Sequence, residues 1–101
     1  MKSTIEIPNS PSPVGPYSQA IKYNGLTIAS GQIAIDPKTG ILDTSSIENE
    51  TLQILKNIDA LLEAGNLKRD NILKYSIFLK DMNDFNKVNE IYGSFFNKPY
   101  P

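Results

Sequence analysis

The dipeptide Asn24-Gly25 is the feature that most constrains how this chain can fold. It separates two segments rich in strand-forming residues, 18–23 and 26–35. Asn-Gly is a preferred centre of two-residue hairpins, because both positions of the turn need a positive φ. The sequence therefore predicts an antiparallel hairpin with these segments as its strands. A short strand at 4–7 precedes it, and the proline-rich loop 8–13 between them cannot continue a ladder, since proline lacks a backbone donor.

A helix is predicted after the turn at residues 36–40. Ser45 and Glu48 have the spacing of a capping box, and Gly65-Asn66 supplies a left-handed exit about five turns later. Between these signals the apolar residues recur at helical spacing. We assign that face to the core; it comprises Ile47, Ile54, Leu55, Ile58, Leu61 and Leu62.

In the remaining chain the apolar residues first recur at every second position, as in a strand, and then at helical spacing. Residues 73–79 alternate, with Leu73, Tyr75, Ile77 and Leu79 on one face, and predict a strand whose other face is still partly apolar. A second helix is predicted from about Asp84, because apolar residues then recur at helical spacing through Phe96.

This order of elements predicts one α+β domain spanning residues 1–101. A strand–helix–strand crossover within one mixed sheet places both helices on the same face of the sheet. The other face then carries apolar side chains from 26–35 and 73–79, a larger exposed patch than a monomer tolerates. We therefore expect a homo-oligomer.

Composition excludes several kinds of chemistry. The 101 residues contain no histidine, cysteine or tryptophan, so a serine triad, a thiolate nucleophile and the usual zinc sites are not available. We expect no metal and no cofactor. The absence of cysteine and of an apolar leader predicts a cytoplasmic protein, and no run is long enough for a membrane span. The net charge of -1 argues against nucleic acid, and the basic pair Lys68-Arg69 is interpreted as a solvated turn.

Two short phrases are candidates for a binding site. Gly15-Pro16-Tyr17-Ser18-Gln19 and Ser30-Gly31-Gln32-Ile33 each combine small residues that expose the backbone with a polar side chain. Glycine lets a ligand approach the peptide closely, and proline restricts the loop that leads into Tyr17. The alternative interpretation is a pair of ordinary turns.

These phrases also carry a family resemblance. Further motifs along the chain are Pro37-x-Thr39-Gly40, the pair Gln53 and Asn57, and Lys80-Asp81-x-Asn83-Asp84-Phe85-x-x-Val88-Asn89. With these motifs and the two phrases, the chain resembles the Rid (YjgF-like) reactive intermediate deaminases over nearly its whole length. The resemblance implies a chorismate-mutase-like α+β fold and a homotrimer with clefts between subunits. It also implies cofactor-free hydrolysis of 2-imino acids or enamines released in amino-acid metabolism, which is a detoxifying deamination.

The resemblance also implies roles for individual residues. Tyr17, Ser30 and Gly31 are expected in catalysis: the tyrosine hydroxyl orients substrate or water, and backbone groups around Ser30-Gly31 bind a carboxylate or the attacking water. Asn89 and Gln32 are expected in substrate binding. The structural alternatives are a loop anchor for Tyr17, a small strand residue for Ser30 and a solvated helix position for Asn89.

Members of this family continue where the present sequence ends, at Pro101. Their next residues include an arginine that pairs with the substrate carboxylate, and their last strand bears a glutamate that holds the attacking water. That strand lies between those corresponding to 26–35 and 73–79. For these 101 residues we therefore expect weak deaminase activity or none, and we expect the two strands to pair directly or to recruit another chain.

Two other functions were weighed against deamination. One is a non-catalytic protein of the same fold that binds small ligands or partners, which ligand binding without turnover would reveal. The other is ribonuclease activity or inhibition of translation, which the lack of histidine and of a basic surface disfavours.

Overall fold

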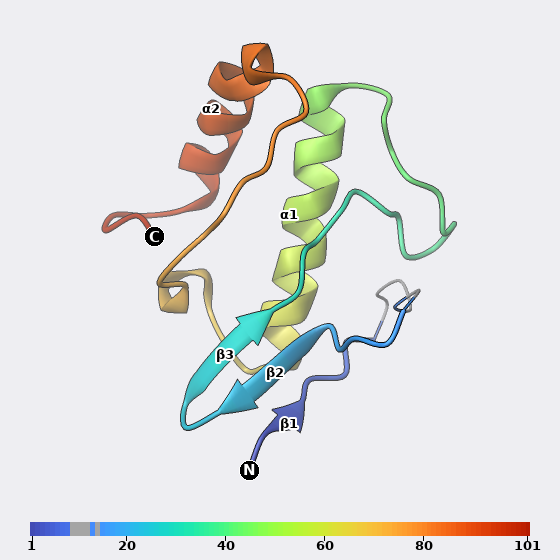
Figure 1. Ribbon diagram of the computed structural model, residues 1–101. Coiled ribbons are helices and arrows are strands. Elements are labelled where there is room, and N and C mark those ends of the chain that lie inside the picture. Colours follow the sequence, from blue (N-terminus) through green and yellow to red (C-terminus); the bar gives the residue numbers. More distant parts are fainter. Residues whose placement is uncertain (9–12, 14) are drawn as a thin grey trace.

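The computed structural model describes residues 1–8, 13 and 15–101, so most of the predicted proline-rich loop lies outside the described residues. The sheet has three antiparallel strands in the order β1-β2-β3: Ser3–Thr4, Ala20–Tyr23 and Leu26–Ala29. Asn24 and Gly25 have φ angles of 50° and 78°, which confirms the predicted hairpin. Figure 1 shows this sheet beside the lower end of the long helix.

The second hairpin strand is shorter than predicted. Its ladder ends at the pair Ala20↔Ala29, and one further hydrogen bond joins the Ser30 amide to the Gln19 carbonyl at 3.0 Å. Beyond that point the only bridge in the described part of this segment is Ile35↔Leu42. The strand ends here because β2 begins at Ala20 and offers no further partner, so the prediction of a strand through residue 35 was too long.

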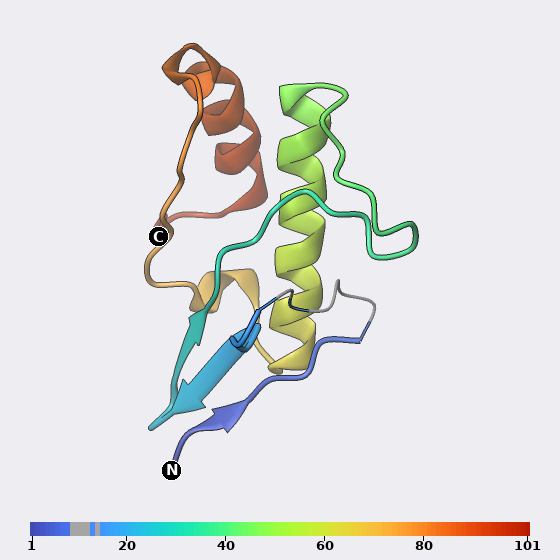
Figure 2. The same cartoon turned by 45° about the vertical axis from the view of Figure 1, so that its right-hand side comes forward.

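Two α-helices pack side by side, as Figures 1 and 2 show. They are α1, Ile47–Ala64, and α2, Phe85–Phe95, and both were predicted. Short 3₁₀ turns flank the segment between them: η1, Arg69–Asn71, and η2, Met82–Asp84. No helix among the described residues is long and apolar enough to cross a membrane.

The cap of α1 differs from the prediction by one residue. Ser46 is the N-cap, and its hydroxyl accepts a hydrogen bond from the Asn49 amide at 3.0 Å. Ser45 instead donates its hydroxyl to Asp43 Oδ1 at 2.6 Å, and its backbone amide donates to the same oxygen. Because Asp43 engages Ser45 in a local turn, the helix begins one residue later and the capping box with Glu48 does not form.

The core is built from both helices, from β2 through Ala20 and from the segment after β3 through Ala34. Leu55, Leu61 and Leu62 of α1 are buried, as are Val88 of α2 and Phe96 just after it. Phe96 also belongs to an aromatic cluster, with ring centroids 5.6 Å from Tyr75 and 4.7 Å from Tyr92. Burial among these rings raises the pKa of Tyr75 to about 12.

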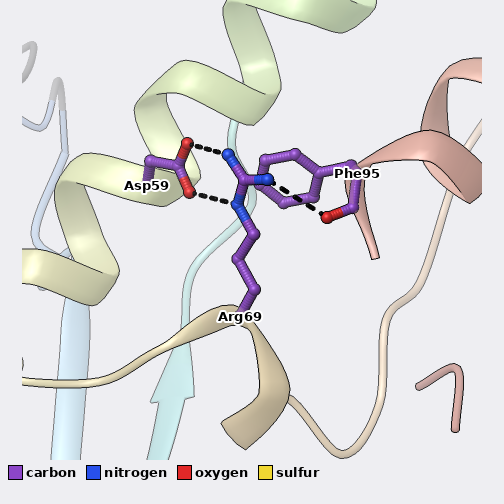
Figure 3. A network of polar contacts seen from close by, with 3 residues as sticks. All are labelled: Asp59, Arg69 and Phe95. Atoms are coloured by element: carbon purple, nitrogen blue, oxygen red, sulfur yellow. Dashed lines mark hydrogen bonds and ion pairs between the residues drawn. The ribbon is translucent and has the colours of Figure 1, made fainter. Parts of the chain in front are cut away.

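Arg69 joins three parts of the chain, as Figure 3 shows. Its guanidinium donates to both carboxylate oxygens of Asp59 at 2.9 and 2.7 Å, and to the Phe95 carbonyl at 3.2 Å. It also lies 3.7 Å from the centroid of the Phe95 ring. The hydrogen bonds to Asp59 raise the pKa of Arg69. Lys68 and Arg69 are exposed at a turn, as interpreted from the sequence, and the arginine in addition bridges α1 and the end of α2.

The predicted strand at 73–79 forms no ladder in the described part of the chain. The segment has no assigned secondary structure, and among the described residues β3 pairs only with β2, so the expected direct pairing of 73–79 with the hairpin does not occur. The predicted strand–helix–strand crossover and mixed sheet are therefore absent from the described part of the chain, whose sheet is entirely antiparallel. Leu73 and Phe78 are 80% and 94% exposed. An alternating sequence becomes a strand only beside a hydrogen-bonding partner, and no described segment supplies one here.

Replacing the cap residue tests its assignment. Ser46→Ala should lower the free energy of unfolding by about 1 kcal/mol, because the Asn49 amide loses its acceptor. Urea denaturation measures the change, with Ser45→Ala as the matched control. A larger loss for Ser45→Ala than for Ser46→Ala would contradict the assignment and restore Ser45 as the cap.

Candidate functional site

The two candidate phrases meet at the end of the hairpin. The Ser30 hydroxyl donates to the Ser18 carbonyl at 2.6 Å. Gln32 Nε2 lies 3.3 Å from Gln19 Oε1 and 3.2 Å from the Ser30 carbonyl. These contacts extend the association of the two chain segments beyond the last ladder pair. The predicted site residues Ser30 and Gln32 are thereby held next to the residues that follow Tyr17.

Tyr17 and Gly31 both leave room for a ligand. The Tyr17 side chain is 48% exposed, and its backbone amide donates to the Gly15 carbonyl at 2.9 Å. A Cβ placed on Gly15 would lie 3.5 Å from the Tyr17 ring, so the ring rests close to that glycine. Gly31 is exposed, and no described atom apart from its neighbours lies within 4 Å of where its Cβ would be. A small molecule can therefore reach the peptide groups at Gly31.

Asn89 lies in different surroundings from the other predicted site residues. It is an exposed residue of α2 and lines a small, mostly apolar hollow of about 150 Å³. The other lining residues are Ile77, Leu79, Met82, Phe85 and Val88. Neither Tyr17 nor Ser30 lines this hollow. Ser30, Gly31 and Gln32 thus lie beside Ser18 and Gln19, the residues that follow Tyr17, and Asn89 belongs to a second surface.

A buried asparagine supports the segment that carries Gly31. Asn57 is 7% exposed, and its Nδ2 donates to the carbonyls of Ile33 and Ile35 at 3.0 and 2.9 Å. Its Oδ1 accepts from Gln53 Nε2 at 3.0 Å. Our sequence reasoning placed Asn57 in a motif but gave it no role. The sequence did carry a signal: Asn57 lies one helical turn from the apolar positions Ile54 and Leu61 of α1, which indicates a buried amide that needs hydrogen-bond partners.

The polar groups of this region can bind and orient a small molecule through hydroxyl, amide and backbone dipoles. Among the described residues no group of three or more carboxylate side chains is placed to hold a metal ion. Hydroxyl, amide and peptide groups of this kind can position water or an oxyanion.

Comparison with known proteins shows the family of this chain. A sequence model of the family described as "Endoribonuclease L-PSP" matches residues 7–101. The chain belongs to the Rid (YjgF-like) family. A Rid family protein of unknown function from Yersinia pestis, solved by crystallography, superimposes with a TM-score of 0.93 at 48% identity, over 100% of this chain and 79% of that one. The predicted α+β fold of the Rid family is thereby confirmed.

Curated Rid relatives include both uncharacterised and named proteins. A RutC family protein of Pyrococcus horikoshii is 46% identical over 101 residues, which cover 100% of this chain and 80% of that protein. A protein of Salmonella typhimurium named 2-iminobutanoate/2-iminopropanoate deaminase is 41% identical over 98 residues, 97% of this chain and 76% of its own length. The family thus contains enzymes that process small molecules.

The support given by Asn57 can be tested by removing its amide. Asn57→Ala should lower the free energy of unfolding by about 2 kcal/mol, because the Ile33 and Ile35 carbonyls lose their donors. Chemical denaturation measures the loss, and Asn86→Ala, at an exposed position of α2, is the control. Equal losses for the two variants would show that the buried amide is not a main support of this segment.

Proposed function

We propose that this protein hydrolyses small 2-imino acids to 2-oxo acids and ammonia. The observation that carries the proposal is the hydrogen-bonded junction of Ser18–Gln19 with Ser30–Gln32, beside an accessible Gly31 and Tyr17, in a member of a family with a named imine deaminase. Water adds to the imine carbon to form a carbinolamine, and the C–N bond then breaks to release ammonia. Since the carbon is already electrophilic, positioned dipoles suffice and the reaction needs no cofactor.

In this proposal each residue has a distinct part. The Tyr17 hydroxyl orients the attacking water or the imine, and backbone groups at Gly31 bind the carboxylate. The Ser30 hydroxyl is already donated to the Ser18 carbonyl, so Ser30 acts as an acceptor and through its backbone. Gln32 contacts the substrate from the hairpin end. Asn89 lines the separate hollow next to α2, so in this proposal it contacts the substrate from a neighbouring subunit of the homo-oligomer, across a cleft between subunits.

The proposal includes weak activity for the 101 residues by themselves. Their only arginine is Arg69, and its guanidinium is already engaged by Asp59 and by the Phe95 carbonyl. No second guanidinium within this sequence can hold the substrate carboxylate in a bidentate pair. A loosely held substrate reacts slowly, because a misplacement of about 1 Å can cost about 10²-fold in rate.

A chimera that supplies the C-terminal residues of the S. typhimurium deaminase tests both parts of the proposal. We expect the chimera to accelerate the formation of 2-oxobutanoate from freshly generated 2-iminobutanoate, and the 101-residue chain to do so weakly or not at all. In the chimera Tyr17→Phe should lower the rate about 10²-fold, since it removes the positioning hydroxyl. Tyr23→Phe is the matched control, at a tyrosine of similar exposure in β2.

The outcomes separate the two claims. An inactive but folded chimera contradicts the deaminase function itself. Strong catalysis by the 101-residue chain, abolished by Tyr17→Phe, contradicts the need for an arginine and leaves the deaminase function standing.

The second candidate is a non-catalytic binding protein, favoured by the engagement of Arg69. Binding of 2-oxobutanoate by a chimera that does not hydrolyse the imine would support it. Ribonuclease activity, named in the family description, has little support, since the chain has no histidine and a net charge of -1.

We also propose that the protein is a cytoplasmic homo-oligomer, and most specifically a trimer. Leu26 and Ile28 of β3 are 52% and 67% exposed, on the strand face opposite the more buried Thr27, and Ile33 nearby is 59% exposed. Apolar side chains gathered in this way are typical of a face that is covered in an assembly. The trimer itself rests on the family resemblance.

Light scattering of the purified protein measures its mass in solution. We expect the mass of three chains, and Ile28→Lys should shift it toward one chain, because a charge then faces the covered apolar surface. Lys22→Glu in β2 is the control for a charge change on an exposed polar position. A monodisperse monomer at micromolar concentration would contradict the proposed assembly.

A further inference from the structure

A second hollow, lined mainly by polar residues, is formed by residues other than those assigned to deamination. It has a volume of about 280 Å³ and lies between the loop residues Asp36–Lys38 and one face of α1. The helix contributes Gln53, Lys56, Asn57 and Ala60, which share that face through their spacing of three and four residues. None of the residues assigned to deamination lines this hollow.

The charged groups of the hollow favour a ligand that carries a carboxylate. Lys38 and Lys56 are exposed, and neither forms an ion pair with any residue that the structure describes. Asp36 is the one carboxylate of the lining, and its Oδ1 accepts from the Lys38 backbone amide at 2.9 Å. That contact orients the carboxylate in a tight turn. The two ammonium groups can pair with a ligand carboxylate, and the Asp36 carboxylate can pair with a cationic group on the same ligand.

The amide groups of the hollow present acceptors at fixed positions. Gln53 Nε2 donates to Asn57 Oδ1, and Asn57 is itself held by the carbonyls of Ile33 and Ile35. This arrangement turns the nitrogen of Gln53 toward Asn57 and leaves Gln53 Oε1 as an acceptor. Together with the Asp36 carboxylate, it can receive hydrogen bonds from a donor group on the same ligand.

We propose that this hollow binds a small zwitterion of the amino-acid class. The ligand carboxylate lies between Lys38 and Lys56, and the ligand ammonium group faces Asp36 and Gln53 Oε1. A volume of about 280 Å³ suits a small metabolite, because it lies just below the range of about 300–1,000 Å³ typical of sites for larger ligands.

Titration followed by two-dimensional NMR tests the site with the whole chain. The probes are glycine, β-alanine and 4-aminobutanoate, which differ in the spacing of their charges, and acetate, which lacks the ammonium group. We expect shifts at the backbone amides of 36–38 and 53–60, and an affinity for the best zwitterion about tenfold above that for acetate. Equal affinity for acetate and for every zwitterion would overturn the assignment of Asp36 and Gln53 Oε1.

Variants of exposed lysines locate the charge contacts without threatening the fold. Lys38→Gln and Lys56→Gln should each weaken binding about fivefold, while Lys22→Gln, on β2, should leave it unchanged. Tyr17→Phe should also leave it unchanged, which separates this site from the deaminase site. The proposal is overturned if no probe shifts these amides at about 50 mM, or if Lys22→Gln weakens binding as much as the two hollow lysines do.

Discussion

The buried amide of Asn57 is the contact on which the arrangement of the candidate site depends. It donates to two carbonyls, Ile33 and Ile35, that lie 24 and 22 positions earlier in the chain. The segment leaving β3 is thereby held against α1 although it forms no ladder there. Because hydrogen bonds shielded from water are costly to break, this pair of contacts limits the movement of the preceding Gly31.

A second constraint comes from Arg69, which ties the end of α2 to α1 through Asp59 and Phe95. These contacts engage the guanidinium of Arg69 fully in holding the two helices together. What remains near the hairpin end is neutral: a phenol, a hydroxyl, an amide and peptide groups. Such groups suit a reaction whose carbon is already electrophilic, since they need only position water and substrate.

Local signals predicted the hairpin and both helices because each of these elements is specified by residues close together in sequence. Asn24-Gly25 adopts its turn whatever lies beyond it, and the apolar face of α1 is a periodicity that 18 residues contain in full. The one-residue error at the cap arose because Ser45 and Ser46 are chemically equivalent, and a hydrogen bond from Ser45 to Asp43 decided between them. The alternation at 73–79 predicted a strand, but a ladder also needs a partner.

The sequence by itself determined the Asn24-Gly25 turn, the two helices and the lack of histidine and cysteine for catalysis. It also placed Tyr17, Ser30, Gly31 and Gln32 in two recognisable phrases. Only the tertiary structure decided that Ser30 gives its hydroxyl to Ser18, that Asn89 lines a separate apolar hollow and that Arg69 is engaged by Asp59. The physical reason is the range of the interactions. Propensity and periodicity act between near neighbours, whereas the partner of a side chain is set by which distant segments pack together.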